Sequence, residues 1–167
     1  MAQQDNLISA QKAFQNLRET LKTVQLATLD TEGQPEASYA PFVWFEQNYY
    51  LYLSELAKHT TNLLGNSAIS LLFIESEESS RNLFARRRII LKGEAQAITR
   101  DAEIFEQVMA QFKSQFGKFM DLIQPLQDFH LFQIKIHSGR FVQGFAQAYE
   151  LSGPGLNEIR HIGNDSR

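Results

Sequence analysis

The sequence has no cysteine among its 167 residues. It therefore forms no disulfide, offers no thiolate nucleophile and lacks the sulfur ligands of most structural zinc sites. A domain of this length buries roughly 70% of the surface that its unfolded chain exposes, so it needs neither a cross-link nor a metal to fold. The absence of cysteine also agrees with a cytoplasmic location, which we expect for this protein.

Long hydrophobic runs and a strong net charge are missing as well. No segment approaches the roughly 20 apolar residues that cross a bilayer, and the polar N-terminus lacks the apolar stretch of a signal peptide. The net charge is −3, so the molecule as a whole does not attract nucleic acid. We expect neither a membrane nor a nucleic acid as a partner. Sequence motifs of P-loops, GxGxxG turns and HExxH metal sites are also absent.

The hydrophobic pattern that is present changes its period along the chain. Spacings of three and four residues predict helices over 9–22, 55–66 and 100–123, the last with a break at Gly117. Short β-rich segments predict strands over 24–29, 36–45, 49–54, 68–75, 87–98, 129–138 and 140–151. Within these, Gly93 predicts a bend and Gly139 a turn between the last two strands.

These segments predict a mainly β protein in which the strands form an antiparallel barrel of six to seven strands with flanking helices. The connections are too short for parallel crossovers, and barrel closure removes exposed sheet edges. We expect a single domain over 1–167, with mobile polar ends at 1–8 and 153–167. The almost wholly apolar segment 68–75 predicts a strand buried on both faces. With 89–91, its residues 68–74 predict pairing with a second copy of the chain.

Two clusters of polar residues predict a phosphate site. Three consecutive arginines, Arg86–Arg88, lie at the entry to the fifth strand and offer bidentate hydrogen bonds to an anion. Hydroxyls, cations and free backbone amides also converge where the third strand leads into a helix, at Ser54, Lys58, His59, Thr60 and Thr61. The alternatives remain a solvated strand edge for the arginines and an ordinary capped helix for the second cluster.

Together these motifs resemble a known superfamily. The segments SYAPF, YLSELAKHTTNLL, LFARRR and GRFVQGFAQAYEL are similar to those of the FMN-binding split barrels related to pyridoxamine 5′-phosphate oxidase. The similarity is greatest to the haem-utilisation subgroup of HugZ/HutZ type, and it extends from about Leu17 to Gly163. Because the C-terminal RHIGNDSR lacks the arginine-rich pattern of the true oxidases, vitamin B6 oxidation is not expected.

The resemblance implies a split β-barrel that forms a homodimer with its cofactor at the subunit interface. It implies that the strand from Ser38 through Tyr39, Ala40 and Pro41 to Phe42 lines the flavin ring. It further implies that Ser54, Lys58, His59 and Thr60 bind the flavin phosphate, which Arg87 and Arg88 approach from the fifth strand. The leading hypothesis is therefore an FMN-binding, flavin-dependent oxidoreductase.

Haem is the alternative ligand. Members of the haem subgroup that degrade haem use a histidine near the C-terminus, and His161 is the tail histidine here. Imidazole is the usual protein ligand of haem iron, and Asp128 is a candidate to orient such an imidazole across a dimer interface. A second alternative is a non-enzymatic dimeric barrel that has kept the fold and lost the cofactor.

Overall fold

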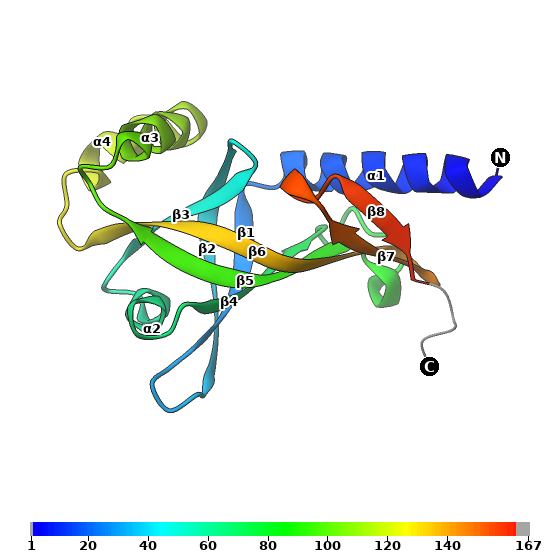
Figure 1. The fold of residues 1–167 in the computed structure, drawn as a ribbon, viewed down its shortest axis with the longest axis horizontal. Coiled ribbons are helices and arrows are strands. Elements are labelled where there is room, and N and C mark those ends of the chain that lie inside the picture. Colours follow the sequence, from blue (N-terminus) through cyan, green and yellow to red (C-terminus); the bar gives the residue numbers. More distant parts are fainter. Residues whose placement is uncertain (1, 163–167) are drawn as a thin grey trace.

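The computed structural model describes residues 2–162, and its centre is a barrel closed by six antiparallel strands (Figure 1). The barrel strands are β1 (Thr23–Leu29), β2 (Pro35–Phe45), β3 (Asn48–Ser54), β4 (Ala68–Ile74), β5 (Arg88–Ile98) and β6 (Phe129–Gly144). They pair in the order β3-β2-β1-β4-β5-β6, and pairing of β3 with β6 closes the ring. Closure leaves no free edge among the six strands, and it confirms the predicted antiparallel barrel.

Two further strands extend the sheet beyond the barrel. The second half of β6 pairs with β7 (Gln147–Ser152), which pairs with β8 (Glu158–His161). The chain reaches β8 through the short 3-10 helix η2 (Pro154–Leu156). The described sheet therefore has eight strands, where the sequence predicted six to seven. The additional strand is β8, whose four residues are mostly polar and gave no hydrophobic alternation to detect.

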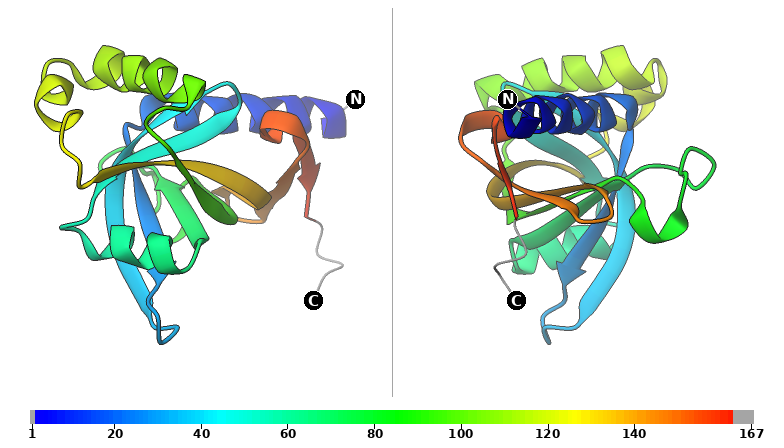
Figure 2. Two further views of the ribbon diagram at one scale, coloured as in Figure 1. Left: turned by 60° about the vertical axis from the view of Figure 1, so that its left-hand side comes forward. Right: turned by 90° about the vertical axis from the view of Figure 1, so that its right-hand side faces the viewer.

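Four α-helices surround the barrel. Helix α1 (Ala2–Thr20) and the pair α3 (Glu103–Phe116) and α4 (Phe119–Ile123) lie along one side of the molecule, and α2 (Lys58–Gly65) lies on the opposite side (Figures 1 and 2). Gly117 separates α3 from α4 with φ = 72°, as the sequence predicted. No helix within residues 2–162 has both the length and the hydropathy needed to cross a bilayer.

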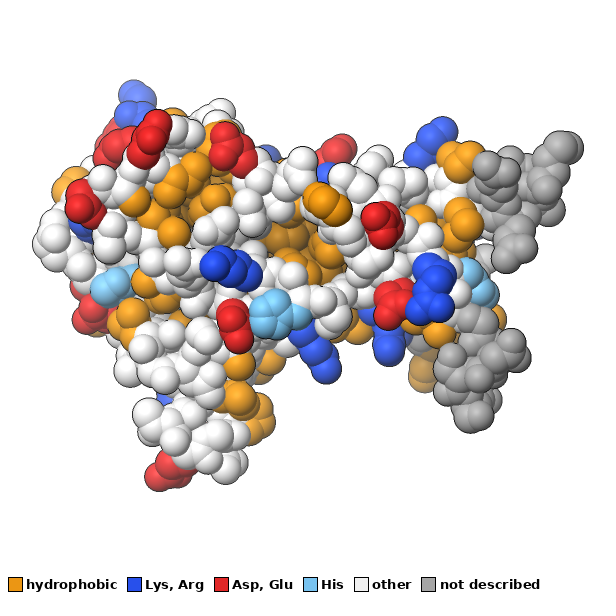
Figure 3. All heavy atoms as spheres, in the orientation of Figure 1, with side chains coloured by type: hydrophobic (Ala, Val, Ile, Leu, Met, Phe, Trp, Pro, Cys, Tyr) orange, Lys and Arg blue, Asp and Glu red, His pale blue; other side chains and the backbone are white. Residues whose placement is uncertain are grey.

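The core has two parts. The barrel interior is filled by aromatic and aliphatic side chains, among them Phe42, Tyr49 and Phe73, whose rings lie 5.0–5.8 Å apart. Helix α1 adds Phe14 to it, which meets Phe141 of β6 edge to face. A second cluster forms where α3 and α4 pack on the outside of β3 and β6. Figure 3 shows hydrophobic side chains reaching the surface in the region of these two helices.

Three sequence predictions need correction. Gly139 does not turn the chain: β6 runs through it, and the turn lies at Phe145 and Ala146. At Gly139 the packing is close, because a Cβ would come within 2.9 Å of the Leu91 side chain and 3.0 Å of the Leu151 side chain. The chain ends contain more regular structure than predicted, since α1 begins at Ala2 and residues 158–161 form β8. Strand β4 buries one face only, because Leu72 and Ile74 point outward and are partly exposed.

Candidate functional site

The outward side chains of β2, β1, β4 and β5 form a surface that we call the outer face. Its members are Ala37, Tyr39, Gln25, Ala27, Ser70, Leu72, Arg88 and Ile90, and they line a hollow of about 780 Å³. Strand alternation explains this side, because Leu26, Leu71 and Ile89 point into the barrel and their neighbours point out. Tyr39 is 68% exposed although it is a large aromatic residue.

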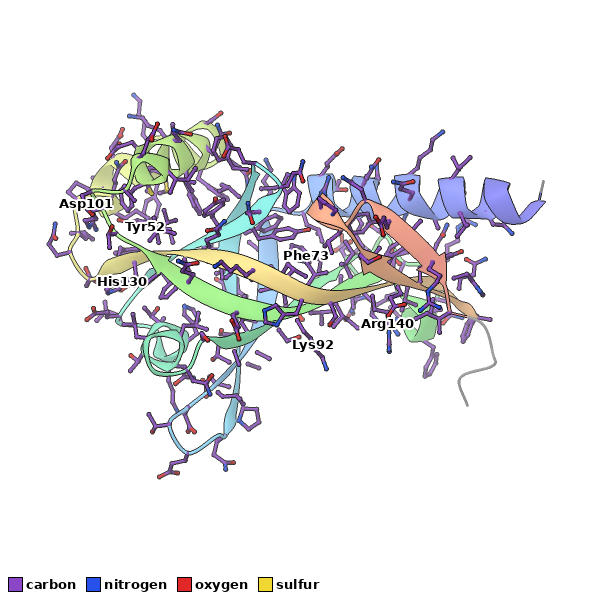
Figure 4. All side chains as sticks on the ribbon, in the orientation of Figure 1. Tyr52, Phe73, Lys92, Asp101, His130 and Arg140 are labelled. Carbon is purple, nitrogen blue, oxygen red and sulfur yellow. The ribbon has the colours of Figure 1, made fainter. Side chains whose placement is uncertain are left out.

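The pairing register aligns these side chains in rows across the sheet. One row runs from Tyr39 through Gln25, Leu72, Ile90, Arg140 and Glu150 to Arg160. Its centre is apolar and its β6–β8 end is charged. Figure 4 labels Lys92 and Arg140 on this side of the β5–β6 ribbon. A surface of this kind suits a flat ligand that has an apolar body and an anionic margin.

The three arginines at the start of β5, Arg86–Arg88, point to different places. Arg87 is held by Glu75, whose carboxylate accepts from the Arg87 backbone N at 2.8 Å and from Nε at 2.6 Å. Arg86 donates to the Glu75 carbonyl. Arg88 lies on the outer face and donates from Nη1 to the Arg86 carbonyl at 3.0 Å, which leaves its other N–H groups for a ligand. Glu75 is 7% exposed and was not identified from the sequence.

The electrostatics of Glu75 follow from these contacts. Burial raises the pKa of Glu75, but the hydrogen bonds and the charge of Arg87 outweigh burial and hold it below its usual value. Arg87 and Glu75 line a second hollow of about 550 Å³, which also contains Phe145 of the β6–β7 turn. Arg87 and Arg88, predicted to reach one phosphate, therefore face two different hollows.

The hydroxyls and cations around α2 are used in local contacts. Ser54 Oγ donates to Asp128 Oδ2 at 2.7 Å, and Thr60 Oγ1 donates to the Ser54 carbonyl at 2.6 Å. Lys58 Nζ lies 3.7 Å from Glu36 Oε2 in an exposed ion pair. These contacts tie α2 to the ends of β2, β3 and β6. They do not form one cradle with Arg87 and Arg88.

Ser38 and His59, two of the predicted residues, do meet. His59 Nδ1 lies 2.8 Å from Ser38 Oγ, and the imidazole is buried under α2. Burial lowers the pKa of His59 below its usual value, and the charge of Glu36 opposes that shift in part. On β2, Tyr39 and Pro41 point outward, whereas Ala40 and Phe42 are buried in the barrel. Only part of the predicted SYAPF lining is therefore available on the surface.

The remaining histidines lie at separate places. His130 Nε2 pairs with Glu55 Oε1 at 2.5 Å, near the end of β3. His137 lies in β6 with Nε2 3.8 Å from Glu94 Oε2. His161, in β8, has Nε2 3.3 Å from the Ala146 carbonyl and its ring edge to face with Tyr149. Asp128 directly precedes β6, whereas β8 joins the sheet through β7, which pairs with the second half of β6, so one chain does not bring Asp128 to His161.

Comparison with known proteins agrees with this architecture. Residues 10–143 match the family model for pyridoxamine 5′-phosphate oxidase. HutZ of Vibrio cholerae serotype O1, named a haem oxygenase, is 41% identical over 149 residues, which are 89% of this chain and 85% of HutZ.

Two solved structures are also similar to this chain. A crystal structure of Vibrio cholerae HutZ, described as a haem storage protein, has a TM-score of 0.73 at 39% identity and covers 75% of this chain and 89% of HutZ. The crystal structure of Campylobacter jejuni ChuZ has a TM-score of 0.83 at 30% identity, over 95% of this chain and 64% of ChuZ.

These findings overturn the leading hypothesis of an FMN-dependent oxidoreductase, because the similarity is to proteins named for haem and not for flavin. The geometry supplies a physical reason, since the residues predicted to bind the flavin phosphate are divided among separate local contacts. The resemblance noted from the sequence is confirmed: the chain belongs to the pyridoxamine 5′-phosphate oxidase family, within which it is similar to the HutZ and ChuZ proteins.

Proposed function

We propose that this protein binds haem on its outer face and acts in haem utilisation. The observation that carries the proposal is the 41% identity to HutZ over 89% of the chain. Haem is a flat apolar ring with two carboxylates, and when bound it supplies iron-centred redox chemistry. The oxygenase name of HutZ makes haem a candidate substrate here as well as a ligand.

The residues of the outer face fit such a ligand. Leu72 and Ile90 offer an apolar floor, and the exposed ring of Tyr39 offers a flat wall. Arg88 at the margin of the hollow has N–H groups directed to no other described residue, which suits bidentate binding of a propionate. The Glu75–Arg87 contact fixes the chain immediately before Arg88, so it orients that arginine.

The proposal includes a homodimer that encloses the haem between two outer faces. Strand β4 buries its inner side, whereas Leu72 and Ile74 on its outer side stay partly exposed in one chain. A symmetric copy placed on this face would remove that surface from water, since an isologous interface uses the same patch twice. Each copy would also exclude water from the ligand of the other.

The test is a hemin titration followed in the Soret region. Wild-type protein is expected to saturate at a fixed hemin ratio. An Arg88→Ala variant is expected to bind about tenfold more weakly, because one charge-assisted contact is worth about 1.5–3 kcal/mol when well formed and less when partly exposed. Lys118→Ala, which removes an exposed cation at α4, is the matched control and should bind as wild type.

Adding a reductant in air extends the test. Loss of the Soret band of bound hemin would indicate haem breakdown, and a stable band would indicate that haem is held without being degraded. If hemin causes no saturable change in the Soret region of the wild-type protein, the proposal is contradicted. That result would favour a barrel that binds no haem.

A further inference from the structure

The segment between β4 and β5 forms an arm with an apolar tip. We call residues 76–87 the arm, and it contains the short 3-10 helix η1 (Leu83–Ala85). Its tip carries Leu83 and Phe84, which are 61% and 91% exposed. In the right-hand view of Figure 2 the arm, drawn in green, projects away from the barrel on the side of β1 and β2. Two adjacent large apolar side chains held in water indicate a surface that another molecule covers.

Hydrogen bonds hold the arm in this conformation. Asn82 Oδ1 accepts from the Phe84 backbone N at 2.9 Å, and Ser80 Oγ donates to the Asn82 carbonyl at 3.0 Å. The inner side of the arm, including Asn82, lines the second hollow, and neither Leu83 nor Phe84 belongs to that lining. The tip therefore points away from its own chain.

The base of the arm adjoins the outer face. Arg87 ends the arm, and the next residue, Arg88, lines the β5 margin of the 780 Å³ hollow. Tyr39 lies at the opposite margin, on β2. The lining comes from β1, β2, β4 and β5 and includes no residue of the arm, all of which the structure describes. The arm therefore leaves the hollow of its own chain uncovered.

Charges on the arm and on the outer face are of opposite sign. The arm carries the exposed side chains of Glu77 and Glu78. Strands β5 and β6 carry Arg88, Lys92 and Arg140 on the side of the outer face, and none of these cations forms an ion pair within residues 2–162. A second copy of the chain thus offers the arm a surface of complementary charge.

We propose that the arm of each copy lies on the outer face of the other in the homodimer, where Phe84 closes the partner's haem hollow beside Tyr39. The inference rests on the proposed haem-binding homodimer. A two-fold axis through the centre of the hollow exchanges the β2 margin of one copy with the β5 margin of the other. The arm beside Arg88 then meets the Tyr39 margin of the partner. Haem has two flat apolar faces, and Phe84 covers the one that the strands of a single chain leave in water.

Thiol cross-linking tests where the arm lies, because the chain has no cysteine of its own. Phe84→Cys and Tyr39→Cys chains are co-expressed and treated with a short bismaleimide, which bridges two thiols without the strict geometry of a disulfide. The pair should give a covalent dimer on a denaturing gel. Leu122→Cys, at a 70% exposed position of α4, replaces Phe84→Cys in the matched control and should give little. Light scattering checks that each protein is dimeric.

Hemin titration tests whether the arm completes the site. Phe84→Ala should bind hemin about tenfold more weakly, because part of the contribution of a buried aromatic side chain is lost, and Leu122→Ala should bind as wild type. Co-expression of Phe84→Ala with Arg88→Ala should restore a class of sites with wild-type affinity. In a mixed dimer, one site then combines the intact Arg88 of one chain with the intact Phe84 of the other.

The other outcomes overturn the inference. Cross-linking no stronger than the Leu122→Cys control, in protein that is dimeric, contradicts the placement of the arm. Unchanged hemin affinity in a dimeric Phe84→Ala protein contradicts the contact with haem, and mixed dimers that restore no site contradict its origin in the partner. A monomeric wild-type protein, or one that binds no hemin, would instead contradict the proposed function, so the two failures are distinguishable.

Discussion

Replacing Glu75 by glutamine tests how the arginine segment before β5 is held. The Glu75 carboxylate accepts two hydrogen bonds from Arg87, at 2.8 Å from the backbone N and 2.6 Å from Nε, and it is 7% exposed. Glutamine keeps the shape but removes the charge, and its amide group turns a donor toward one of these two N–H groups. A buried donor left without an acceptor is costly.

The expected loss is about 1–2 kcal/mol of the free energy of unfolding at pH 7. A hydrogen bond to a charged group contributes about 1.5–3 kcal/mol, and we reduce that value because the Arg87 side chain is 39% exposed and its charge is screened by water. Urea unfolding measures the difference. Glu77→Gln is the control, because the Glu77 side chain is 72% exposed, and it should change stability by less than about 0.5 kcal/mol.

The pH dependence gives a second readout of the same contact. The folded-state pKa of Glu75 is lower than its value in the unfolded chain, since the hydrogen bonds and charge of Arg87 outweigh burial. This stabilisation is therefore complete above the unfolded pKa of about 4.3 and is lost as the pH falls through the folded pKa. The gap between wild type and Glu75→Gln should narrow in acid. An equal gap at pH 7 and at pH 3, or no gap at either, would refute the reasoning.

Three further predictions concern the core, Gly93 and the dimer. Phe73→Ala should lower the free energy of unfolding by about 3–5 kcal/mol in urea denaturation, because Phe73 is fully buried against Phe42 and Tyr49; a loss below 1 kcal/mol would contradict the barrel core described here. Gly93→Ala should cost about 1–3 kcal/mol in the same assay, because its Cβ would overlap the Lys135 carbonyl, and unchanged stability would contradict the close approach. Tyr39→Glu should convert the proposed homodimer to a monomer by light scattering with the fold intact, since Tyr39 is an exposed aromatic residue of the outer face; a monomeric wild-type protein would contradict the interface.

Most of the correct predictions about the fold come from local features of the sequence, namely hydrophobic alternation and the positions of glycines. The alternation in residues 24–54 predicts three strands, and the structure confirms them as β1, β2 and β3. Gly117 and Gly93 were correctly predicted as a break and a bend. The prediction for Gly139 was wrong, because a glycine packed closely against Leu91 and Leu151 within a strand has the same sequence signature as a glycine in a turn.

The site was harder to predict because it depends on long-range register. Polar side chains near one another in the sequence suggested a phosphate site, but strand alternation separates Arg87 from Arg88 and α2 directs Lys58 to Glu36. The outer face joins β2 to β5 across four strands, and its apolar members resemble ordinary core residues in the sequence. One signal was present: Leu72 and Ile74 are apolar residues on the side of β4 that one chain leaves partly exposed.

Hydrogen exchange of the backbone amides with and without hemin tests the central claim most directly. If haem binds on the outer face, hemin should slow exchange in β1, β2, β4 and β5, in the segments that contain Gln25, Tyr39, Leu72 and Ile90. Exchange in α3 and α4, which pack on another side of the barrel, should not change. Protection confined to α3 and α4, or no protection at saturating hemin, would contradict the account.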